Sequence, residues 1–199
     1  ITTDMPVAPE TMRSILQTAV DVSFNKVTVD SDTSTNDSVF FFSSGVGAPV
    51  ADADAASVVL SEAVRIVCED LARQIAADGE GATKLVTVYV RDAASETDAD
   101  KAARTIANSP LVKTAIAGRD CNWGRIAAAL GRSGARFDQY AVDIDIMGMP
   151  VLRAGLPCGF DEDEALRRFE ADEIVIEVSL GTDGDAATRV WTCDLTHEY

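Results

Sequence analysis

The sequence predicts an α+β protein, a layered sandwich in which helices pack on mostly antiparallel sheets. Two long segments, 9–24 and 54–77, carry apolar residues at helical spacing. Strand patterns fill most of the last third of the chain, and one strongly alternating strand lies before them at 84–91. With 199 residues, 47% of them hydrophobic, the chain is long enough and apolar enough to bury a full core.

Apolar spacing and turn residues predict the elements of the first half. Pro9 suits the first position of the helix over 9–24. Short strands are predicted at 26–30 and 39–42, on either side of a polar stretch. The helix over 54–77 is acidic at its start. Its apolar face is predicted to consist of Leu60, Ala63, Val64, Val67, Leu71 and Ile75.

The middle of the chain contains the clearest strand, 84–91, whose alternating valines point to one face. The glycine-bracketed turn 78–81 ends the helix before it. A capping box at 97–100 predicts a helix that continues through Asn108. A helix of small residues is predicted over 126–131.

The C-terminal third is predicted to be mostly β-structure. One acidic helix, 161–169, interrupts it, and the segment 181–184 is predicted to join the last two strands as a hairpin. The predicted strands are 140–146, 150–154, 173–180 and 187–195.

Charge and hydropathy exclude several classes of partner. The chain has 17 basic and 33 acidic residues, a formal net charge of −16. Such a chain repels nucleic-acid phosphates and anionic lipid surfaces. Apolar runs are too short to span a bilayer, and no secretory signal pattern is present. We therefore expect a cytoplasmic protein that binds neither nucleic acid nor a membrane.

The common catalytic and metal-binding motifs are absent. Four scattered cysteines and the single histidine, His197, form no recognisable zinc motif, so we expect reduced thiols and no metal. No dinucleotide fingerprint, phosphate-binding loop or nucleophile elbow occurs. We expect no serine or cysteine to partner His197, which argues against a hydrolase built on a histidine base.

Three segments carry more polar side chains than a surface loop needs. Segment 30–38 is rich in hydroxyls and carboxylates, and a network of side-chain turns is favoured there over a binding site. Segment 78–84 places Glu80 among small residues, which suits either a ligand or a solvated turn. Segment 118–125 is interpreted equally well as a polar plug or as a ligand-binding loop.

Four blocks of sequence cover these segments and the stretch between them. They are DTSTND at 32–37, EGATK at 80–84, SPLVKTA at 109–115 and DxNWGR at 120–125. In this order they resemble the ornithine acetyltransferase family, whose members are also called bifunctional glutamate N-acetyltransferases. The resemblance extends over the whole chain, from Ile1 to Tyr199.

The resemblance implies an N-terminal-nucleophile-like fold and a precursor that cleaves itself into an α chain and a β chain. This chain is expected to be one β-chain unit, with a catalytic sandwich over about 1–135 and a smaller C-terminal part over about 136–199. The new N-terminal threonine of the β chain is the family's nucleophile. By the resemblance it lies a few residues before Ile1, so neither Thr2 nor Thr3 is assigned to it.

The resemblance carries only one substrate-binding residue onto this chain, Glu80. The family's oxyanion-hole residues and a substrate-binding lysine belong to the α chain, and further contacts follow the segment that ends here at Tyr199. Cys121 stands where proline is common in relatives, a departure that affects only loop rigidity.

The implied reaction moves an acetyl group from N-acetylornithine to glutamate through an acetyl-threonine, without a cofactor. It yields ornithine and N-acetylglutamate, and the implied assembly is an α2β2 heterotetramer. A self-processing aminopeptidase of the same fold is the alternative, in which water replaces glutamate. A non-catalytic amino-acid-binding subunit is a third possibility. Acetyl-CoA as a second donor, and a specialised pathway in place of arginine biosynthesis, stay open.

Overall fold

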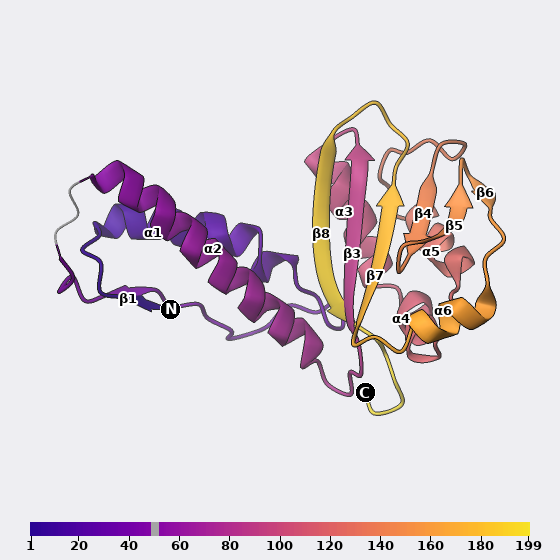
Figure 1. Cartoon of the computed structure of the whole chain (residues 1–199), viewed down its shortest axis with the longest axis horizontal. Helices are drawn as coiled ribbons and strands as arrows, with labels where there is room; N and C mark the ends of the chain where they lie inside the picture. Colours follow the sequence, from indigo (N-terminus) through magenta and orange to yellow (C-terminus); the bar gives the residue numbers. More distant parts are fainter. Residues whose placement is uncertain (49–51) are drawn as a thin grey trace. The chain divides into compact units, whose positions relative to one another are not determined.

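The computed structural model describes residues 1–48 and 52–199. Their contacts group them into two compact units (Figure 1). Unit 1 contains 1–26 and 33–74, and unit 2 contains 27–32 and 75–199. The predicted C-terminal part, from about 136, contributes strands and one helix to unit 2, and its standing as a separate part stays a prediction.

Unit 1 is a helical pair with a very small sheet. Its buried core consists of Ile15, Ala19, Val64 and Cys68, which lie on its two α-helices. The two strands pair in parallel, Thr2 with Phe42 and Thr3 with Ser43. Its elements are α1 (Pro9–Asp21), the 3-10 turn η1 (Phe24–Lys26), β1 (Thr2–Thr3), β2 (Phe42–Ser43) and the part of α2 (Ala53–Ala77) up to Gln74.

The predicted helix over 54–77 is confirmed, but its predicted buried face is only partly right, because Val64 is buried and three other members are exposed. Val67, Leu71 and Ile75 are 43%, 38% and 48% exposed. The buried stripe follows a spacing of four residues instead: Val64, Cys68, Ala72 and Ala76. The helix is apolar on more than one side, so the sequence period alone could not select the face.

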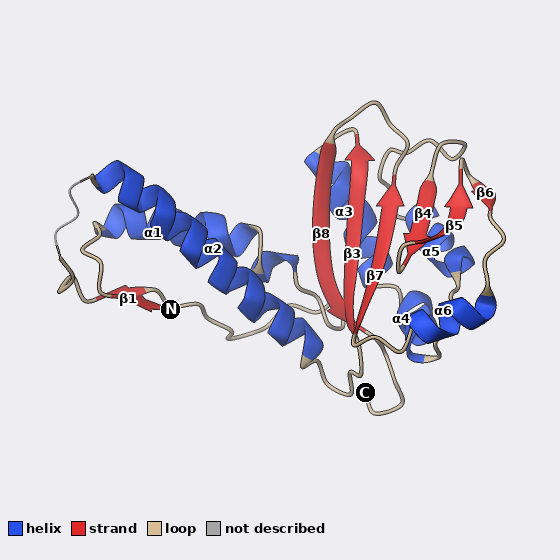
Figure 2. Ribbon diagram, viewed as in Figure 1, coloured by secondary structure: helices blue, strands red, loops and turns tan. Residues whose placement is uncertain are grey.

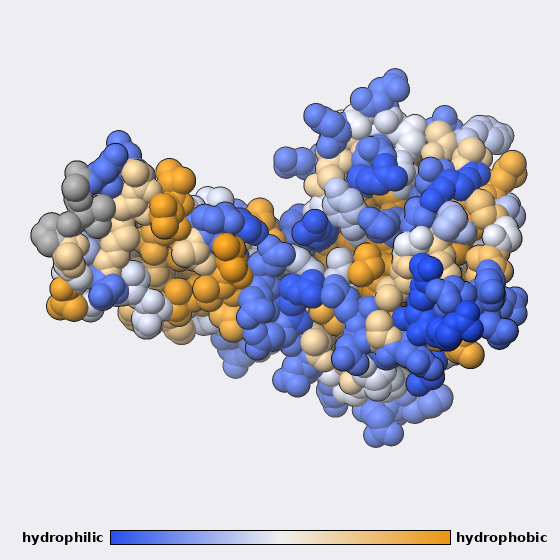
Figure 3. Space-filling model, viewed as in Figure 1, coloured by the Kyte–Doolittle hydropathy of each residue, from blue (hydrophilic) through white to orange (hydrophobic). Residues whose placement is uncertain are grey.

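Hydrophobic side chains remain exposed on unit 1, and orange residues are visible there in Figure 3. They lie mostly on α2 and on the segment around β2. Among the described residues of unit 1, the exposed large hydrophobic ones are Val22, Phe40, Phe42, Val46, Val58, Val59, Ile66, Val67 and Leu71.

Unit 2 is built on a six-stranded sheet in the order β6-β5-β4-β7-β3-β8 (Figure 2). All neighbouring strands are antiparallel except the pair β3 and β7. The α+β class with mostly antiparallel strands is therefore confirmed. The strands are β3 (Leu85–Ala93), β4 (Asp143–Ile146), β5 (Met149–Arg153), β6 (Leu156–Pro157), β7 (Glu173–Ser179) and β8 (Ala186–Cys193).

Helices cover one face of this sheet. Val86, Val88 and Val90 of β3 are fully buried against them, as the alternation predicts. Alanines on the buried side of α3 allow this helix to pack closely on β3 and β8. The helices of unit 2, besides the end of α2, are α3 (Glu96–Ala107), α4 (Pro110–Ala117), α5 (Trp123–Gly131) and α6 (Glu162–Arg168).

Several predicted local details are wrong. The last two strands form no hairpin, because β3 lies between β7 and β8. The predicted strand over 26–30 is reduced to one bridge, Val27 with Trp191. The α3 cap is Ser95, whose hydroxyl accepts a hydrogen bond from Asp98 N, so the helix begins ahead of the predicted box.

Helix α4 was not predicted. In the sequence, Pro110 is interpreted as the end of the helix before it. In the structure, Pro110 instead occupies the first turn of α4. Helix α5 likewise begins at Trp123, ahead of the predicted start at 126. None of the helices in the described ranges is both long and apolar enough to cross a membrane.

Candidate functional site

Glu80 lies in the short turn 78–84, between the end of α2 and the start of β3. A hydrogen bond from Ala82 N to Gly79 O, 3.0 Å long, closes this turn. Glu80 is exposed, and its carboxylate receives no hydrogen bond or ion pair from any residue that the structure describes. The turn therefore presents an unpartnered negative charge that a cationic ligand could bind.

The C-terminal segment 193–199 packs against the turn that carries Glu80. Gly81 has a φ of +64°, and a Cβ there would lie 2.6 Å from Tyr199 N. A Cβ on Gly79 would lie 2.8 Å from Cys193 Sγ. Only glycine fits this close approach at both positions. Thr196 donates a hydrogen bond of 2.6 Å from Oγ1 to Gly81 O, which fixes the contact.

Asp194 holds the other end of the turn. It is only 1% exposed. One carboxylate oxygen accepts hydrogen bonds from Thr83 N and Lys84 N, at 2.8 and 3.0 Å. The other accepts one from Thr83 Oγ1, at 2.6 Å. Charge-assisted hydrogen bonds of this kind are stronger than neutral ones, so the backbone next to Glu80 is firmly held.

The surroundings of Glu80 are negatively charged. The Tyr199 hydroxyl donates a hydrogen bond of 2.9 Å to Asp30. This bond is the main reason that the pKa of Tyr199 is raised, and burial together with the charges of Asp30, Glu80 and Asp32 raises it further. Hydrogen bonds from Asp32 N and then from Tyr199 lower the pKa of Asp30. Three carboxylates near one hydroxyl suit a cation and disfavour an anion.

The hydroxyl-rich segment behaves as the turn interpretation predicts. Ser34 Oγ accepts hydrogen bonds from Asn36 N and Asp37 N, at 3.3 and 3.0 Å. Asp30 likewise accepts from Asp32 N, at 2.9 Å. These side chains satisfy the backbone of their own turns.

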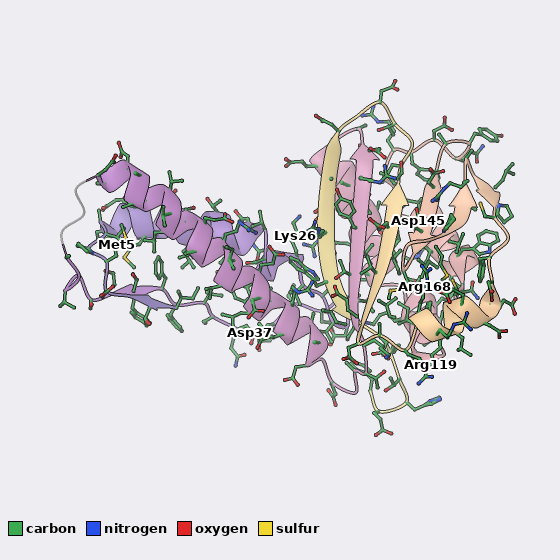
Figure 4. The ribbon with its side chains drawn as sticks, viewed as in Figure 1. Met5, Lys26, Asp37, Arg119, Asp145 and Arg168 are labelled. Carbon is green, nitrogen blue, oxygen red and sulfur yellow. The ribbon has the colours of Figure 1, made fainter. Side chains whose placement is uncertain are left out.

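The loop 118–125 uses its polar side chains to join two helices. Asn122 caps α5 by accepting a hydrogen bond of 3.1 Å from Arg125 N, and it donates one of 2.8 Å to Asp120. Arg125 donates to Leu111 O at 2.8 Å. Arg119 lies exposed in the same loop (Figure 4). Most of this polarity therefore stabilises the α4–α5 connection.

Two further sequence expectations concern metals and His197. The described residues contain no group of three or more His, Cys, Asp or Glu side chains placed to hold a metal ion. His197 is exposed in the C-terminal segment, and no described serine or cysteine is hydrogen-bonded to it. All four cysteines are free thiols.

In unit 1, the residues that follow Ile1 are held in an extended conformation. Ile1 N donates a hydrogen bond of 2.8 Å to Phe40 O. Thr3 Oγ1 accepts one of 3.2 Å from Met5 N, so this hydroxyl serves its own turn. Ile1 is partly buried and packs against the core of unit 1.

Sequence reasoning singled out Glu80 as a candidate but missed the residues that support its turn. Asp194 follows directly on an apolar strand, a weak signal for a carboxylate whose oxygens bind backbone N–H groups. Lys113 is 4% exposed in α4. A lysine inside an apolar run is a stronger signal, because buried lysines are rare unless they are paired.

Comparison with known proteins gives one family. The ArgJ family model matches residues 1–199. The arginine biosynthesis bifunctional protein ArgJ of Chlorobium chlorochromatii is 48% identical over 199 residues, which are 100% of this chain and 46% of that protein. The protein of the same name from Dehalococcoides mccartyi is 47% identical over 201 residues, covering 100% of this chain and 49% of its own length. The chain thus spans about half the length of the curated relatives it matches.

A solved structure agrees with these relatives. The crystal structure of arginine biosynthesis bifunctional protein ArgJ from Bacillus halodurans has a TM-score of 0.94 and 41% identity. The match covers 100% of this chain and 94% of the crystallised one.

Proposed function

The chain belongs to the ArgJ family, and from that premise we propose that it is the β chain of a self-cleaving ornithine acetyltransferase. The enzyme transfers the acetyl group of N-acetylornithine to glutamate. The unpartnered carboxylate of Glu80, in a turn that its neighbours hold firmly, is the observation that carries this proposal.

The nucleophile in this proposal is a threonine a few residues before Ile1, freed by cleavage of the precursor. Its α-amine has an ordinary pKa of about 8, close to working pH, so it serves as the base for its own hydroxyl. The hydroxyl oxygen forms an ester bond with the acetyl carbon, and the amide bond of N-acetylornithine breaks. The hydroxyl proton goes to the leaving amine, and ornithine departs.

The second half of the cycle regenerates the enzyme. The amine of glutamate attacks the acetyl-threonine, the ester bond breaks, and the threonine oxygen takes back a proton. N-acetylglutamate leaves. Two donors contributed by the α chain stabilise the oxyanion in both halves. No cofactor is needed, because the acetyl group passes only between the amines and the threonine.

Glu80 binds the side-chain ammonium of the donor. In N-acetylornithine the α-amine is acetylated, so the side-chain ammonium is the one cationic group. The negative surroundings, with Asp30 and Asp32 near Tyr199, favour a cation at this turn. Gly79, Gly81 and Ala82 leave the carboxylate without bulky neighbours in its own turn.

The α chain is the proposed partner. The relatives are about twice as long as this chain, and unit 1 exposes a set of large hydrophobic side chains on α2 and around β2. Exposed apolar patches of this kind commonly mark protein interfaces. We propose that the α chain from the same precursor covers them in an α2β2 heterotetramer, and that the assembly is cytoplasmic.

The test uses the full-length precursor, purified and incubated with N-acetylornithine and glutamate. We expect an intact-mass spectrum with two polypeptides, the second beginning at a threonine upstream of Ile1. Ornithine and N-acetylglutamate should form in equal amounts. Release of free acetate at the same rate, with or without glutamate, would instead assign the aminopeptidase-like alternative. An active preparation containing one uncut chain would exclude the threonine mechanism.

A further inference from the structure

Lys113 makes an unusual set of contacts for a lysine. Its ammonium is buried and donates hydrogen bonds to Thr192 Oγ1 at 2.9 Å and to Cys193 O at 2.5 Å. It also contacts Cys193 Sγ at 3.6 Å. Each of its three N–H groups therefore has an acceptor at the end of β8. The backbone contributes as well, because Lys113 O accepts a hydrogen bond of 3.3 Å from Leu195 N.

Asp194, the residue after Cys193, connects the Lys113 contact to the Glu80 turn. Asp194 lies between Cys193 and Leu195, the two residues that bind Lys113. Its carboxylate accepts the hydrogen bonds from Thr83 and Lys84 described above. The backbone segment 193–195 thus links Lys113 to the turn that carries Glu80, with hydrogen bonds to Lys113 on one side and to the turn on the other.

Burial of a lysine needs a reason. Removing an ammonium from water is costly unless it is fully hydrogen-bonded. Burial lowers the pKa of Lys113, while the neighbouring Cys193, Asp194 and Asp30 oppose that change. A methionine would fill the same space at no such cost if packing alone were needed. The hydrogen bonds to Thr192 and Cys193 therefore indicate a role for the lysine other than packing.

We propose that Lys113 is a positioning residue for substrate binding, which acts by holding 192–195 so that Asp194 fixes the turn carrying Glu80. This inference rests on the proposed function in one respect, that Glu80 binds the donor's ammonium. The mechanical link from Lys113 to the turn does not depend on the substrate. The two parts are therefore tested by separate measurements.

The first measurement is amide hydrogen exchange in the full-length, cleaved enzyme. Lys113→Met keeps the volume and removes all three hydrogen bonds. We expect the Thr83 and Lys84 amides to exchange at least about 10-fold faster, because opening of the turn becomes easier. The matched control is Ser179→Ala, which removes a partly buried hydrogen bond to Asp92 at the opposite end of β3 and should leave exchange in the turn unchanged.

The second measurement is steady-state kinetics with N-acetylornithine. A looser turn weakens binding of the ammonium equally before and during the reaction. KM should therefore rise, while kcat stays within about 3-fold. Because Lys113 acts through Glu80, its effect cannot exceed that of Glu80→Gln. We expect at least about a 5-fold fall in kcat/KM for Lys113→Met, and less than about a 2-fold further fall when it is added to Glu80→Gln.

Each outcome decides one part. Unchanged exchange at Thr83 and Lys84 overturns the mechanical link. Faster exchange with an unchanged KM, or full multiplication of the two kinetic losses, overturns the role in binding. A normal KM for Glu80→Gln itself overturns the proposed role of Glu80, and with it the kinetic part of this inference, whatever the exchange shows.

A second variant covers the case in which Lys113→Met does not fold. Asp194→Asn is isosteric and keeps an oxygen for Thr83 N and Lys84 N, but it loses the charge that strengthens these bonds. Exchange at the turn and KM should both shift in the same direction as for Lys113→Met, by smaller factors. If neither quantity shifts, the link through Asp194 is excluded.

Discussion

The turn 78–84 and the loop 118–125 look alike in the sequence and differ in the structure. Both are short, polar and rich in glycine, and both belong to blocks that resemble the same family. In the loop, Asn122 and Arg125 form hydrogen bonds to the two helices that the loop connects. In the turn, the supporting bonds come from outside, mainly from Asp194, and the carboxylate of Glu80 receives none from the described residues.

The difference suggests how a candidate binding turn is told apart from a helix connection. A polar side chain that satisfies its own backbone has less hydrogen-bonding capacity left for a ligand. A polar side chain whose backbone is held by other residues keeps that capacity. The number of polar residues in a segment is therefore a poorer guide than the source of its hydrogen bonds.

The largest expected effect comes from removing one carboxylate charge in each region. Glu80→Gln should lower kcat/KM for N-acetylornithine roughly 10- to 200-fold, because a hydrogen bond to a charged group contributes about 1.5–3 kcal/mol. Asp120→Asn, the matched change in the loop, should leave the kinetics within about 2-fold. Steady-state assays on both variants compare the regions directly, and equal losses would remove the distinction.

Replacing one glycine in each region by alanine should change the free energy of unfolding in opposite directions. Gly81→Ala forces a side chain into a φ of +64° and against Tyr199 N, so the free energy of unfolding should fall by more than about 1 kcal/mol. Gly124→Ala meets nothing closer than Asn122 Oδ1 at 3.5 Å and lies in α5, so it should stabilise by up to about 1 kcal/mol. Denaturant unfolding of both variants measures the contrast, and a neutral Gly81→Ala would contradict the close packing.

Loss of the α5 cap should affect stability alone. Asn122→Ala removes the hydrogen bond to Arg125 N, which should cost about 1 kcal/mol. KM for N-acetylornithine should stay unchanged, because the cap serves the helix. Thermal unfolding and kinetics on one preparation test both halves of this expectation. A raised KM in a well-folded variant would show that the loop also serves the substrate.

The smallest effect concerns the bond between Tyr199 and Asp30. It lowers the pKa of Asp30, so its contribution to stability is complete above the ordinary value of 3.8 and is lost as pH falls through the lowered value. Tyr199→Phe should therefore reduce the free energy of unfolding slightly at pH 6, and the two proteins should converge toward pH 2. Side-chain NMR titration should show the pKa of Asp30 rising in the variant. No change in that pKa would exclude the hydrogen bond in solution.

Regular periodicity made most of the fold predictable. The alternation of 84–91 identified β3 and its buried face, and glycine at 79 and 81 marked the end of α2. The face of α2 was not predictable, because apolar residues lie on more than one side of it. The pairing of β3 between β7 and β8 was not predictable either, since partners so far apart in sequence leave no local signal.

In the candidate site too, the sequence indicated some residues and not others. Glu80 came from a resemblance of short blocks, and the geometry adds that its carboxylate is unpartnered within the described chain. Asp194 and Lys113 were missed because their roles depend on contacts across about 80 to 110 residues. Local sequence shows a charge near a strand or in a helix, but only the fold shows which backbone groups it meets.

The position of β3 in the sheet has a consequence for folding. Its two partners lie close to 90 and 100 residues later in the chain, at Glu173–Ser179 and Ala186–Cys193. Both edges of this apolar strand thus stay unpaired during synthesis until nearly all of unit 2 has left the ribosome. Long-range pairing of this kind is slow, and open strand edges invite aggregation. Expression at low temperature or with chaperones should therefore raise the soluble yield.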